Sequence, residues 1–375
     1  MTLPEPSFIM RDPAQITKEL VAMYESLTGK TLQPAQQERI MIDLIAYRES
    51  LIRIGIQEAA KQNLIDYATF PVLDYLGAFS GTIRLEPQPA RCPLRIALTT
   101  PQPFDVIIPA GTRVETKDGK VVFHTETAAT VLLGLDYVDV WGVAEVTGKI
   151  GNGYVVGDVS NIIDPVPYVA SIINTEITSG GADWEDDDHY RDRIKLAPEK
   201  FSNAGPKEGY IYWAKTAHQD IIDVAVMSPS DAVVNVYPLT KTGIPDANVL
   251  DLVLTALNDE KIRPMTDQVS ALAPTAFDFS IEVNATLFKS AIPEIVTPAI
   301  NSAIENYIAG LKMKLGLDVV DSQIIGWTNT ISGVYKIVVT LKDSAEVPFT
   351  DKVLAENEWA NCTGYTVSIA GYVDG

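Results

Sequence analysis

The densest group of chemically capable side chains is a run of carboxylates near the middle of the chain. It comprises Asp183, Glu185, Asp186, Asp187 and Asp188. Oxygen ligands at this density suit Ca²⁺, so the twelve-residue calcium loop is the pattern to test. That loop needs glycine at its sixth position and glutamate at its twelfth. Counted from Asp183, those positions hold Asp188 and Ile194, so the calcium-loop pattern is absent.

A helix start explains the same carboxylates better. The run leads directly into Tyr190-Arg191-Asp192-Arg193-Ile194. Acidic residues in a first helical turn cap free N–H groups and meet the positive end of the helix dipole. We therefore expect the run to begin a helix, with a bound cation as the alternative.

Histidine and cysteine give no recognisable catalytic or metal pattern. The three histidines, His124, His189 and His218, lack metal-spaced partners, and the sequence contains neither H-E-x-x-H nor paired C-x-x-C. We interpret each as a surface or structural residue. Cys92 and Cys362 form no disulfide framework and suit a reducing compartment. A G-x-S-x-G elbow is also missing from the sequence. We predict no catalytic, cofactor-binding or metal-binding residues, hence no enzyme and no cofactor.

Two weaker signals remain. Gly151-Asn152-Gly153 with Gly157 has the spacing G-x-G-x-x-x-G, and strands are expected on both sides, whereas the dinucleotide fingerprint must open a helix. We expect a hairpin turn there. A pair of carboxylates for glycoside hydrolysis stays open, because a sequence gives no distances between its 49 acidic residues.

Composition limits the classes of partner. The chain has 375 residues, 46% hydrophobic and 21% charged, with a net charge of −20. Nucleic-acid affinity depends on Lys and Arg displacing counterions, so we expect no nucleic-acid partner and no anionic membrane surface. The first residues lack a basic and apolar signal pattern, and no apolar run approaches the roughly 18 residues of a membrane span.

Residues 1–90 are expected to be helical. Asp12 is placed as N-cap before Pro13, with Gln15 to close a capping box and Gly29 to end the helix. A second helix is expected from Pro34 to about Tyr67. It carries two apolar stripes on neighbouring faces, so it must be covered on more than one side. It is either a core helix or an arm that packs against another chain. The stripes are Ile40, Leu44, Tyr47, Leu51 and Ile54, and Ile42, Ile45, Ile52 and Ile56.

The remainder predicts strand-rich and mixed domains. Short strands between glycine and asparagine turns indicate an antiparallel sandwich or barrel over residues 91–178. Helices then alternate with strands over 179–275 and 276–375, and residues 277–287 give the clearest one-face-buried strand. The predicted fold class is α+β multidomain: an N-terminal helical arm, a β-rich antiparallel sandwich or barrel, and one or two small C-terminal α/β sandwich domains.

Several segments, in this order, resemble the baseplate J-like family of contractile-tail wedge proteins. The long helical region comes first, and the others are Ile108–Val114 with Phe123 and Thr125, Gly180–Glu185 running into Tyr190–Ile194, Leu250–Leu257 with Ile262–Met265 and Ala273–Thr275, and Asn357–Ala360. Each motif alone is weak, and their order makes the resemblance specific. The Asp186–His189 run is more acidic than expected of the family.

The resemblance implies a structural role. Family members are non-catalytic wedge components that form a ring around a central hub and couple attachment to sheath contraction. The implied partners are other copies of the chain, a second wedge protein, a small lysozyme-like wedge protein and the hub and spike complex. The implied location is the virion tail baseplate, assembled in the host cytoplasm, or a phage-derived injection device.

The wedge function implies interdomain hinges and large interfaces, on the order of 2,000–5,000 Å². Candidate hinges are Leu85–Pro89 and Ser179–Gly181. By analogy, the helical arm is the candidate for wedge contacts and the C-terminal α/β part for ring contacts. The alternative functions are a carbohydrate-active enzyme and a receptor-binding tail protein. The receptor-binding proteins are usually fibrous trimers with repeats, and no such repeat is visible in the sequence.

Overall fold

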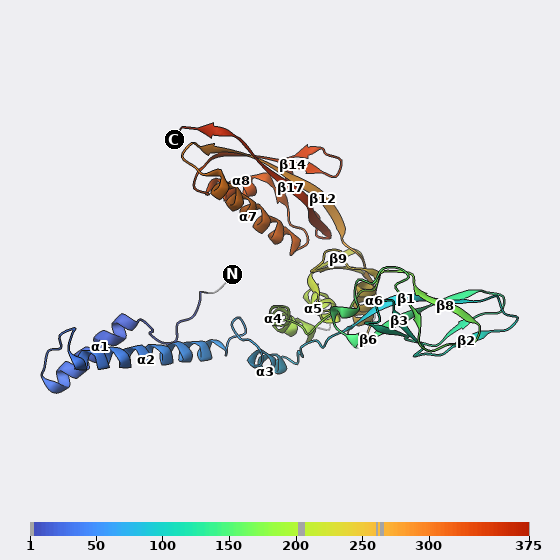
Figure 1. Cartoon of the computed structure of the whole chain (residues 1–375), viewed down its shortest axis with the longest axis horizontal. Helices are drawn as coiled ribbons and strands as arrows, with labels where there is room; N and C mark the ends of the chain where they lie inside the picture. Colours follow the sequence, from blue (N-terminus) through green and yellow to red (C-terminus); the bar gives the residue numbers. More distant parts are fainter. Residues whose placement is uncertain (1–3, 202–206, 260–261, 263–265, 375) are drawn as a thin grey trace. The chain divides into compact units, whose positions relative to one another are not determined.

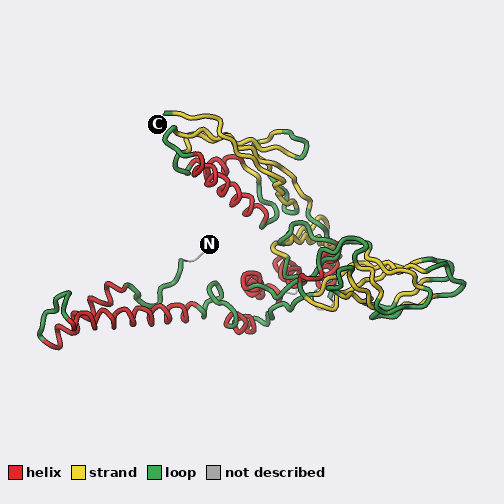
Figure 2. The backbone as a smooth tube through the Cα atoms, viewed as in Figure 1, coloured by secondary structure: helices red, strands yellow, loops and turns green. Residues whose placement is uncertain are grey.

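The computed structural model describes residues 4–201, 207–259, 262 and 266–374 (Figure 1). The chain divides into two compact units. The first contains the residues up to Arg84 together with Tyr190–Lys195, and the second contains Leu85–His189 and Leu196–Gly375. Helices dominate the first unit and strands the second (Figure 2). In the described part of the chain, no helix combines the length and the apolar character needed to cross a bilayer.

The first unit is built on three helices, α1 (Pro13–Thr28), α2 (Gln37–Lys61) and α3 (Val72–Phe79). Asp12 caps α1 by accepting a hydrogen bond from the Ala14 N–H, and Gly29 ends the helix with a left-handed φ of 68°. The predicted capping box does not form, because the Gln15 amide donates to Glu19 one turn onward. Both ends of this helix therefore follow local sequence signals, except for Gln15.

Helix α2 is shorter than predicted, since it ends at Lys61 and not near Tyr67. Its buried residues form one narrow stripe, Ile42, Ala46, Ser50 and Gln57. The small core of this unit lies beyond α2. Ala68 and Leu73 pack there against Tyr190 and Ile194, which belong to α4 (Asp187–Leu196). A helix that follows the barrel in sequence thus completes the core of the N-terminal unit.

The first part of the second unit is a nearly closed antiparallel barrel. Its six-stranded sheet has the order β7-β3-β4-β6-β1-β8, and β2 pairs with β5 in a separate small sheet. Strand β1 alternates half-buried and buried residues along its whole length, as expected of a strand with one face on a core. The strands are β1 (Pro89–Leu98), β2 (Val106–Ile108), β3 (Arg113–Thr116), β4 (Val122–Thr125), β5 (Ala129–Val131), β6 (Tyr137–Thr147), β7 (Val159–Ile162) and β8 (Val169–Asn174).

The predicted hairpin at Gly151–Gly153 is wrong. Residues Lys149–Gly151 form a short 3-10 helix, η1, between β6 and β7. These two strands are not neighbours, because β6 pairs with β1 and β4 while β7 pairs with β3. The glycines therefore serve a crossing connection within the barrel and not a tight turn.

A three-stranded sheet with two helices follows α4. Strands β9 (Ile221–Ser230) and β10 (Val233–Thr240) are antiparallel, and β11 (Gln268–Ala271) pairs with β10 in parallel. Helices α5 (Lys207–Ala217) and α6 (Ala247–Leu257) pack on this sheet through a shared apolar core. A second 3-10 helix, η2 (Ala197–Phe201), follows α4 directly. The predicted residues Arg263–Met265 lie outside the described residues.

The C-terminal part is a four-stranded sheet with the order β15-β14-β12-β17. Strand β12 (Thr275–Phe288) alternates as predicted and pairs in parallel with β17 (Glu358–Val373). Helix α7 (Pro293–Lys312) supplies Val296, Ile300 and Ile304 to the core between helix and sheet. The other elements are β13 (Val319–Val320), α8 (Asp321–Asn329), β14 (Val334–Asp343), β15 (Pro348–Phe349) and β16 (Asp351–Lys352).

These parts confirm the predicted fold class. The chain is an α+β multidomain protein with an N-terminal helical region, an antiparallel barrel and small C-terminal sheets covered by helices. The domain boundaries predicted at residues 90, 178 and 275 stay predictions.

Candidate functional site

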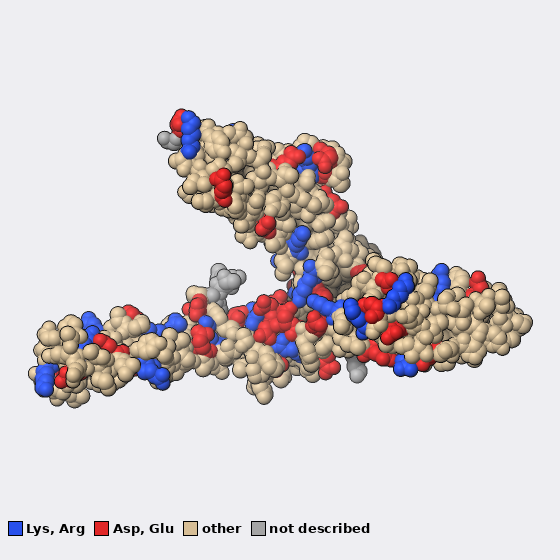
Figure 3. Space-filling model, in the orientation of Figure 1, with Lys and Arg blue, Asp and Glu red and all other residues tan. Residues whose placement is uncertain are grey.

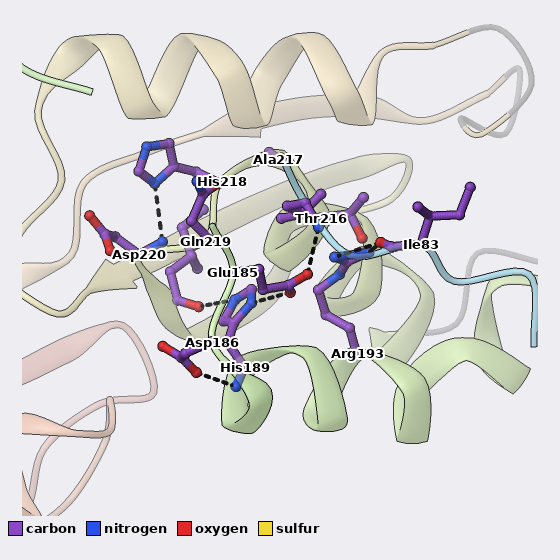
Figure 4. A network of polar contacts seen from close by, with 12 residues as sticks. Ile83, Glu185, Asp186, His189, Arg193, Thr216, Ala217, His218, Gln219 and Asp220 are labelled. Atoms are coloured by element: carbon purple, nitrogen blue, oxygen red, sulfur yellow. Dashed lines mark hydrogen bonds and ion pairs between the residues drawn. The ribbon is translucent and has the colours of Figure 1, made fainter. Parts of the chain in front are cut away.

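His189 is a buried structural side chain at the start of α4 (Figure 4). Its Nδ1 lies 2.5 Å from Glu185 Oε1, and its Nε2 lies 2.9 Å from the carbonyl oxygen of Ile221. The Glu185 side chain is fully buried and also accepts a hydrogen bond from the Leu85 N–H. This pair therefore joins the beginning of α4, the beginning of β9 and the segment before the barrel, all within the second unit.

His218 follows α5 and is buried as a neutral ring. Its Nδ1 accepts from the Asp220 N–H at 3.1 Å (Figure 4). Its Nε2 donates to the Gly180 carbonyl oxygen at 3.2 Å. Burial lowers the pKa of His218, in agreement with a ring that is protonated on one nitrogen. The third histidine, His124, is half-buried in β4 opposite Arg113. Across the described ranges, no three His, Cys, Asp or Glu side chains are arranged to hold a metal ion.

The acidic run begins a helix, as predicted. Asp186 precedes α4 and accepts a hydrogen bond from the His189 N–H at 2.8 Å, which is the geometry of an N-cap. Asp187 and Asp188 occupy the first turn, where they meet the positive end of the helix dipole. Asp183 accepts from the Lys149 N–H at 3.2 Å. Asp183, Asp186 and the pair Asp187 and Asp188 thus have separate structural roles, as Glu185 does.

The two predicted hinges are held to each other's flanks: Gln88 pairs with Ala182, just after the second hinge, and Ser179 pairs with Arg91, just after the first. Gln88 and Ala182 exchange both backbone hydrogen bonds, at 2.8 and 3.0 Å, and Arg91 does the same with Ser179. The buried Gln219 side chain adds hydrogen bonds to the carbonyl oxygens of Glu86 and Asp183. Residues 88–91 and 179–182 therefore form one two-stranded connection that includes part of each predicted hinge. The division between the compact units falls just before it, between Arg84 and Leu85.

A small polar pocket lies beside this connection. It has a volume of about 230 Å³. Its lining includes Gly180, Gly181, His218, Asp220, Thr240 and Asp246. The His218 ring points both of its nitrogens at backbone partners, so it has no free lone pair for a reacting group. In this geometry His218 is a structural residue at the pocket wall.

The helices of the first unit expose an unusual amount of apolar surface. Ile40 is 61% exposed, Ile52 60% and Leu44 55%, although all three belong to the apolar stripes seen in the sequence. Others exposed along α2 are Met41, Ile45, Tyr47, Leu51, Ile54 and Ile56. On the face drawn in Figure 3, the charged side chains of this helical part are scattered between uncharged ones. Monomeric proteins seldom leave contiguous apolar surface of this kind uncovered.

A groove between α1 and α2 continues this surface. Its volume is about 190 Å³. Its lining is apolar apart from one tyrosine hydroxyl: Leu20, Met23, Tyr24, Leu27, Ile42 and Ile45. Met23 and Leu27 follow the helical spacing of α1, and they are 62% and 80% exposed. The periodicity identified the apolar face correctly, whereas the lone chain leaves this face open.

The α4 residues within the first unit hold the segment that follows α2. Arg191 donates to the carbonyl oxygens of Ile65 and Ala68, both at 2.8 Å, and Arg193 donates to that of Ile83 at 3.0 Å. The Tyr190 hydroxyl donates to the Thr82 carbonyl at 2.8 Å. Sequence reasoning missed this role, because these contacts span more than a hundred positions and leave no periodic signal.

Comparison with known proteins gives matches along the chain. Four models of baseplate J-like proteins match in order: the N-terminal domain at residues 39–91, the barrel domain at 94–181, the central domain at 202–273 and the C-terminal domain at 279–368. Baseplate protein J of Escherichia phage P2 is 30% identical over 189 residues, covering 50% of this chain and 60% of that protein. This chain therefore matches less than two thirds of that relative's length.

The chain is also similar to solved structures. One of them is the cryo-EM structure of the anti-feeding prophage baseplate, 6-fold symmetrised. The match covers 93% of this chain and 90% of the other, with 11% sequence identity and a TM-score of 0.39.

Proposed function

Since the chain belongs to the baseplate J-like family, we propose that it is a structural wedge component of the baseplate of a contractile, phage-type tail. The observation that carries this proposal is the match of four family domains, in order, over most of the chain. The relationship to a phage baseplate protein supports it. The proposed location is the tail baseplate of the virion, or of a related injection device, after assembly in the host cytoplasm.

The helical arm is the proposed wedge contact. Here the arm means α1 and α2 with the groove between them. An amphipathic helix from a partner could lie in this groove with its apolar face against Met23, Leu27 and Ile45. These three side chains would then be buried. The proposed donors of such a helix are another copy of the chain and a second wedge protein. The family's small lysozyme-like wedge protein and the hub and spike complex are further proposed partners.

The proposed mechanism is conformational and involves no catalysis. A wedge must hold its contacts while the baseplate is at rest and rearrange when the tail attaches. Bending between rigid bodies provides this, because a hinge needs only a few residues that absorb a backbone change. The proposed hinge comprises the points where the chain passes between the two compact units: the junction of Arg84 and Leu85, and the two ends of Tyr190–Lys195 within α4. The paired residues 88–91 and 179–182 would then move as one body.

Co-purification tests this function. The chain is co-expressed with the proteins encoded by its genomic neighbours, and the mass of the purified complex is measured by light scattering. A stoichiometric complex or a ring supports the proposal. A monomer that binds none of the neighbours contradicts it, and the polar pocket would then be assayed for turnover on glycans.

Paired variants test the arm. The double variant Leu44→Ser with Ile45→Ser removes exposed apolar groups from α2, and Ile107→Ser with Leu133→Ser removes somewhat more exposed apolar groups from the barrel domain. None of these four side chains is buried in the core, so both double variants should keep the wild-type circular dichroism spectrum. We expect only the arm variant to lose its partner. If the arm variant still assembles, the arm is not the wedge contact, and the proposed wedge function is unaffected.

A further inference from the structure

Strand β17 is an outer strand of the C-terminal sheet. Among the strands that the structure describes, it pairs with β12 alone, so its other edge carries unpaired backbone groups. The strand spans Glu358–Val373, which is 16 residues. Two irregularities in the register, at Thr363 and Ala370, bracket a regular run from Gly364 to Ile369. This run is long enough to accept another strand.

The sequence of β17 carries none of the side chains that usually protect an exposed edge. Natural edges are guarded by Lys, Pro, inward-pointing charges or short length. From Trp359 to Val373, β17 has no charged residue and no proline. The comparable outer strand β9 contains Asp223 and Pro229, and the outer strands β11 and β15 have four and two residues. The bulges limit the open edge of β17 but leave its centre regular.

One face of this edge is incompletely covered. Tyr365, Val367 and Ile369 point toward the apolar core under α7, yet each is only partly buried. The alternate residues, Thr366 and Ser368, are exposed on the opposite face. A strand added at this edge would cover the first group and pair with the second. The last strand of the sheet therefore still carries apolar side chains that another strand could cover.

We propose that two copies of the chain join through β17, in antiparallel register about a two-fold axis at Val367. In this register Tyr365 lies opposite Ile369 of the partner subunit, and Thr366 lies opposite Ser368 of the partner subunit. Aromatic–branched pairs and Thr–Ser pairs are among the favourable cross-strand combinations. A closed two-fold contact of this kind uses the same patch on both copies. The inference rests on the proposed function, because it supplies one of the copy-to-copy contacts.

Charge favours a second copy as the occupant. The chain has a net charge of −20, so most surfaces of two copies repel each other. The uncharged run of β17 brings no like charges together. Asp374, the nearest acid beyond the strand, falls opposite Ala360 of the partner subunit in the proposed register. The edge is therefore a place where identical acidic chains can approach closely.

The parity of the register determines where the helices lie. Residues directly opposite in an antiparallel pair share a face of the sheet. Pairing odd with odd positions joins the apolar faces of both copies, so α7 and its counterpart cover the same side of one eight-stranded sheet. A slip by one residue would place Tyr365 opposite Ser368 of the partner subunit and turn one apolar face to solvent.

Cysteine cross-linking tests the register in the full chain. Thr366→Cys and Ser368→Cys are expressed separately and together, and mild oxidation is followed by non-reducing electrophoresis. Only co-expression places two cysteines directly opposite, whereas equal positions lie two residues out of register, beyond the reach of a disulfide. We expect a covalent dimer from the co-expressed pair alone. Cross-linking in none of the samples, or equally in all three, would overturn the proposal.

Charge pairs give a second, reversible test. The double variant Thr366→Lys with Ser368→Lys places lysine opposite lysine at two points, which should weaken self-association roughly tenfold. Thr366→Lys with Ser368→Glu places opposite charges at the same points and should restore it. Equal dimerisation of both variants in sedimentation would contradict the register. If the lysine double variant loses a different protein from the co-purified complex but still dimerises, the β17 edge binds that other protein. The proposal that a second copy binds this edge would then be wrong.

These outcomes separate the two proposals. A complex with neighbouring baseplate proteins that forms without the β17 cross-link leaves the wedge function and removes this contact. A specific cross-link in a chain that binds no neighbour leaves the contact and removes the wedge function.

Discussion

At the residue scale, Gly77 shows how closely α3 packs in the first unit. A Cβ at this position would lie 2.0 Å from the Tyr190 hydroxyl and 2.9 Å from the Thr82 carbonyl oxygen. The hydroxyl donates to that same carbonyl, so a methyl group would break the bond and displace the ring. We expect Gly77→Ala to destabilise the first unit by about 1–3 kcal/mol.

Gly55 is the matched control. It lies inside α2 with nothing within 4 Å of a built Cβ. Gly55→Ala should therefore stabilise the helix by about 0.5–1 kcal/mol. Hydrogen exchange followed by mass spectrometry measures both effects: faster exchange in α3 peptides for Gly77→Ala, and slower exchange in α2 peptides for Gly55→Ala. Equal effects of the two variants would contradict the packing described for Gly77.

Cys92 is buried in β1 and its thiol is shielded from titration. Burial, with the negative charge of Glu176 as the second cause, raises the pKa of Cys92 to about 12. Because the thiolate is the reactive form, we expect no labelling by maleimide at pH 8 in the folded chain and full labelling in denaturant. Mass spectrometry distinguishes the two states. Rapid native labelling of Cys92 would contradict the buried position.

The same shift makes a pH-dependent contribution to stability. The folded pKa lies above the usual value of 9.0, so the folded chain holds the thiol proton more tightly than the unfolded chain does. This contribution is complete below about pH 9 and is lost as the pH rises toward 12. Urea midpoints should fall over this range, and Cys92→Ala should reduce the slope. An unchanged slope in that variant would assign the loss to other groups.

At the element scale, Gln57 ties an extended N-terminal segment to α2. Its side chain is fully buried, accepts from the Phe8 N–H at 2.8 Å and donates to the Pro6 carbonyl oxygen at 2.7 Å. Gln57→Ala leaves two backbone groups without these partners while keeping a good helix former in α2. We expect faster proteolysis before α1 with unchanged helicity.

Limited proteolysis measures this effect, and Gln37→Ala at the exposed start of α2 is the control. Only the first variant should be cut sooner. Protection equal to wild type would mean that the segment is held by other contacts, such as the Arg53 hydrogen bond to the Met10 carbonyl oxygen.

Elements with strong local signals were predictable, and those that depend on distant partners were not. The end of α1 at Gly29 and the alternation of β12 follow from local chemistry. The prediction of a hairpin at Gly151–Gly153 was wrong because β6 is paired with β1 and β4 and not with β7. A glycine pattern does not encode strand order. The open groove beside Met23 could not be predicted, because periodicity identifies an apolar face but not what covers it.

The candidate site divides in the same way. Asp186 was predicted at a helix start because N-caps are local. The pairing of Gln88 with Ala182 and of Arg91 with Ser179 was not predicted, since the two segments are about ninety positions apart and each alone has the composition of a flexible linker. Backbone hydrogen bonds carry no side-chain signature, so only the fold reveals that the two segments meet.

At the scale of the whole molecule, charge sets the conditions for assembly. Each copy carries a net charge of −20, so copies brought together repel. Salt screens this repulsion over a Debye length of about 10 Å at 0.1 M. We expect self-association to strengthen as sodium chloride rises from low to physiological concentration. Analytical ultracentrifugation measures the trend, and weaker association with added salt would indicate contacts between opposite charges.

The discontinuous first unit has a consequence for biosynthesis. Its core needs Tyr190 and Ile194, but Leu85–His189 belongs to the other unit and is translated in between. At ribosomal rates of about 5–20 residues per second, that interval lasts roughly 5–20 s. During it α1 and α2 have emerged while the core that anchors them is still open. The nascent arm therefore meets neighbouring polypeptides before its own chain is finished, and co-translational association becomes available to arms made on the same messenger.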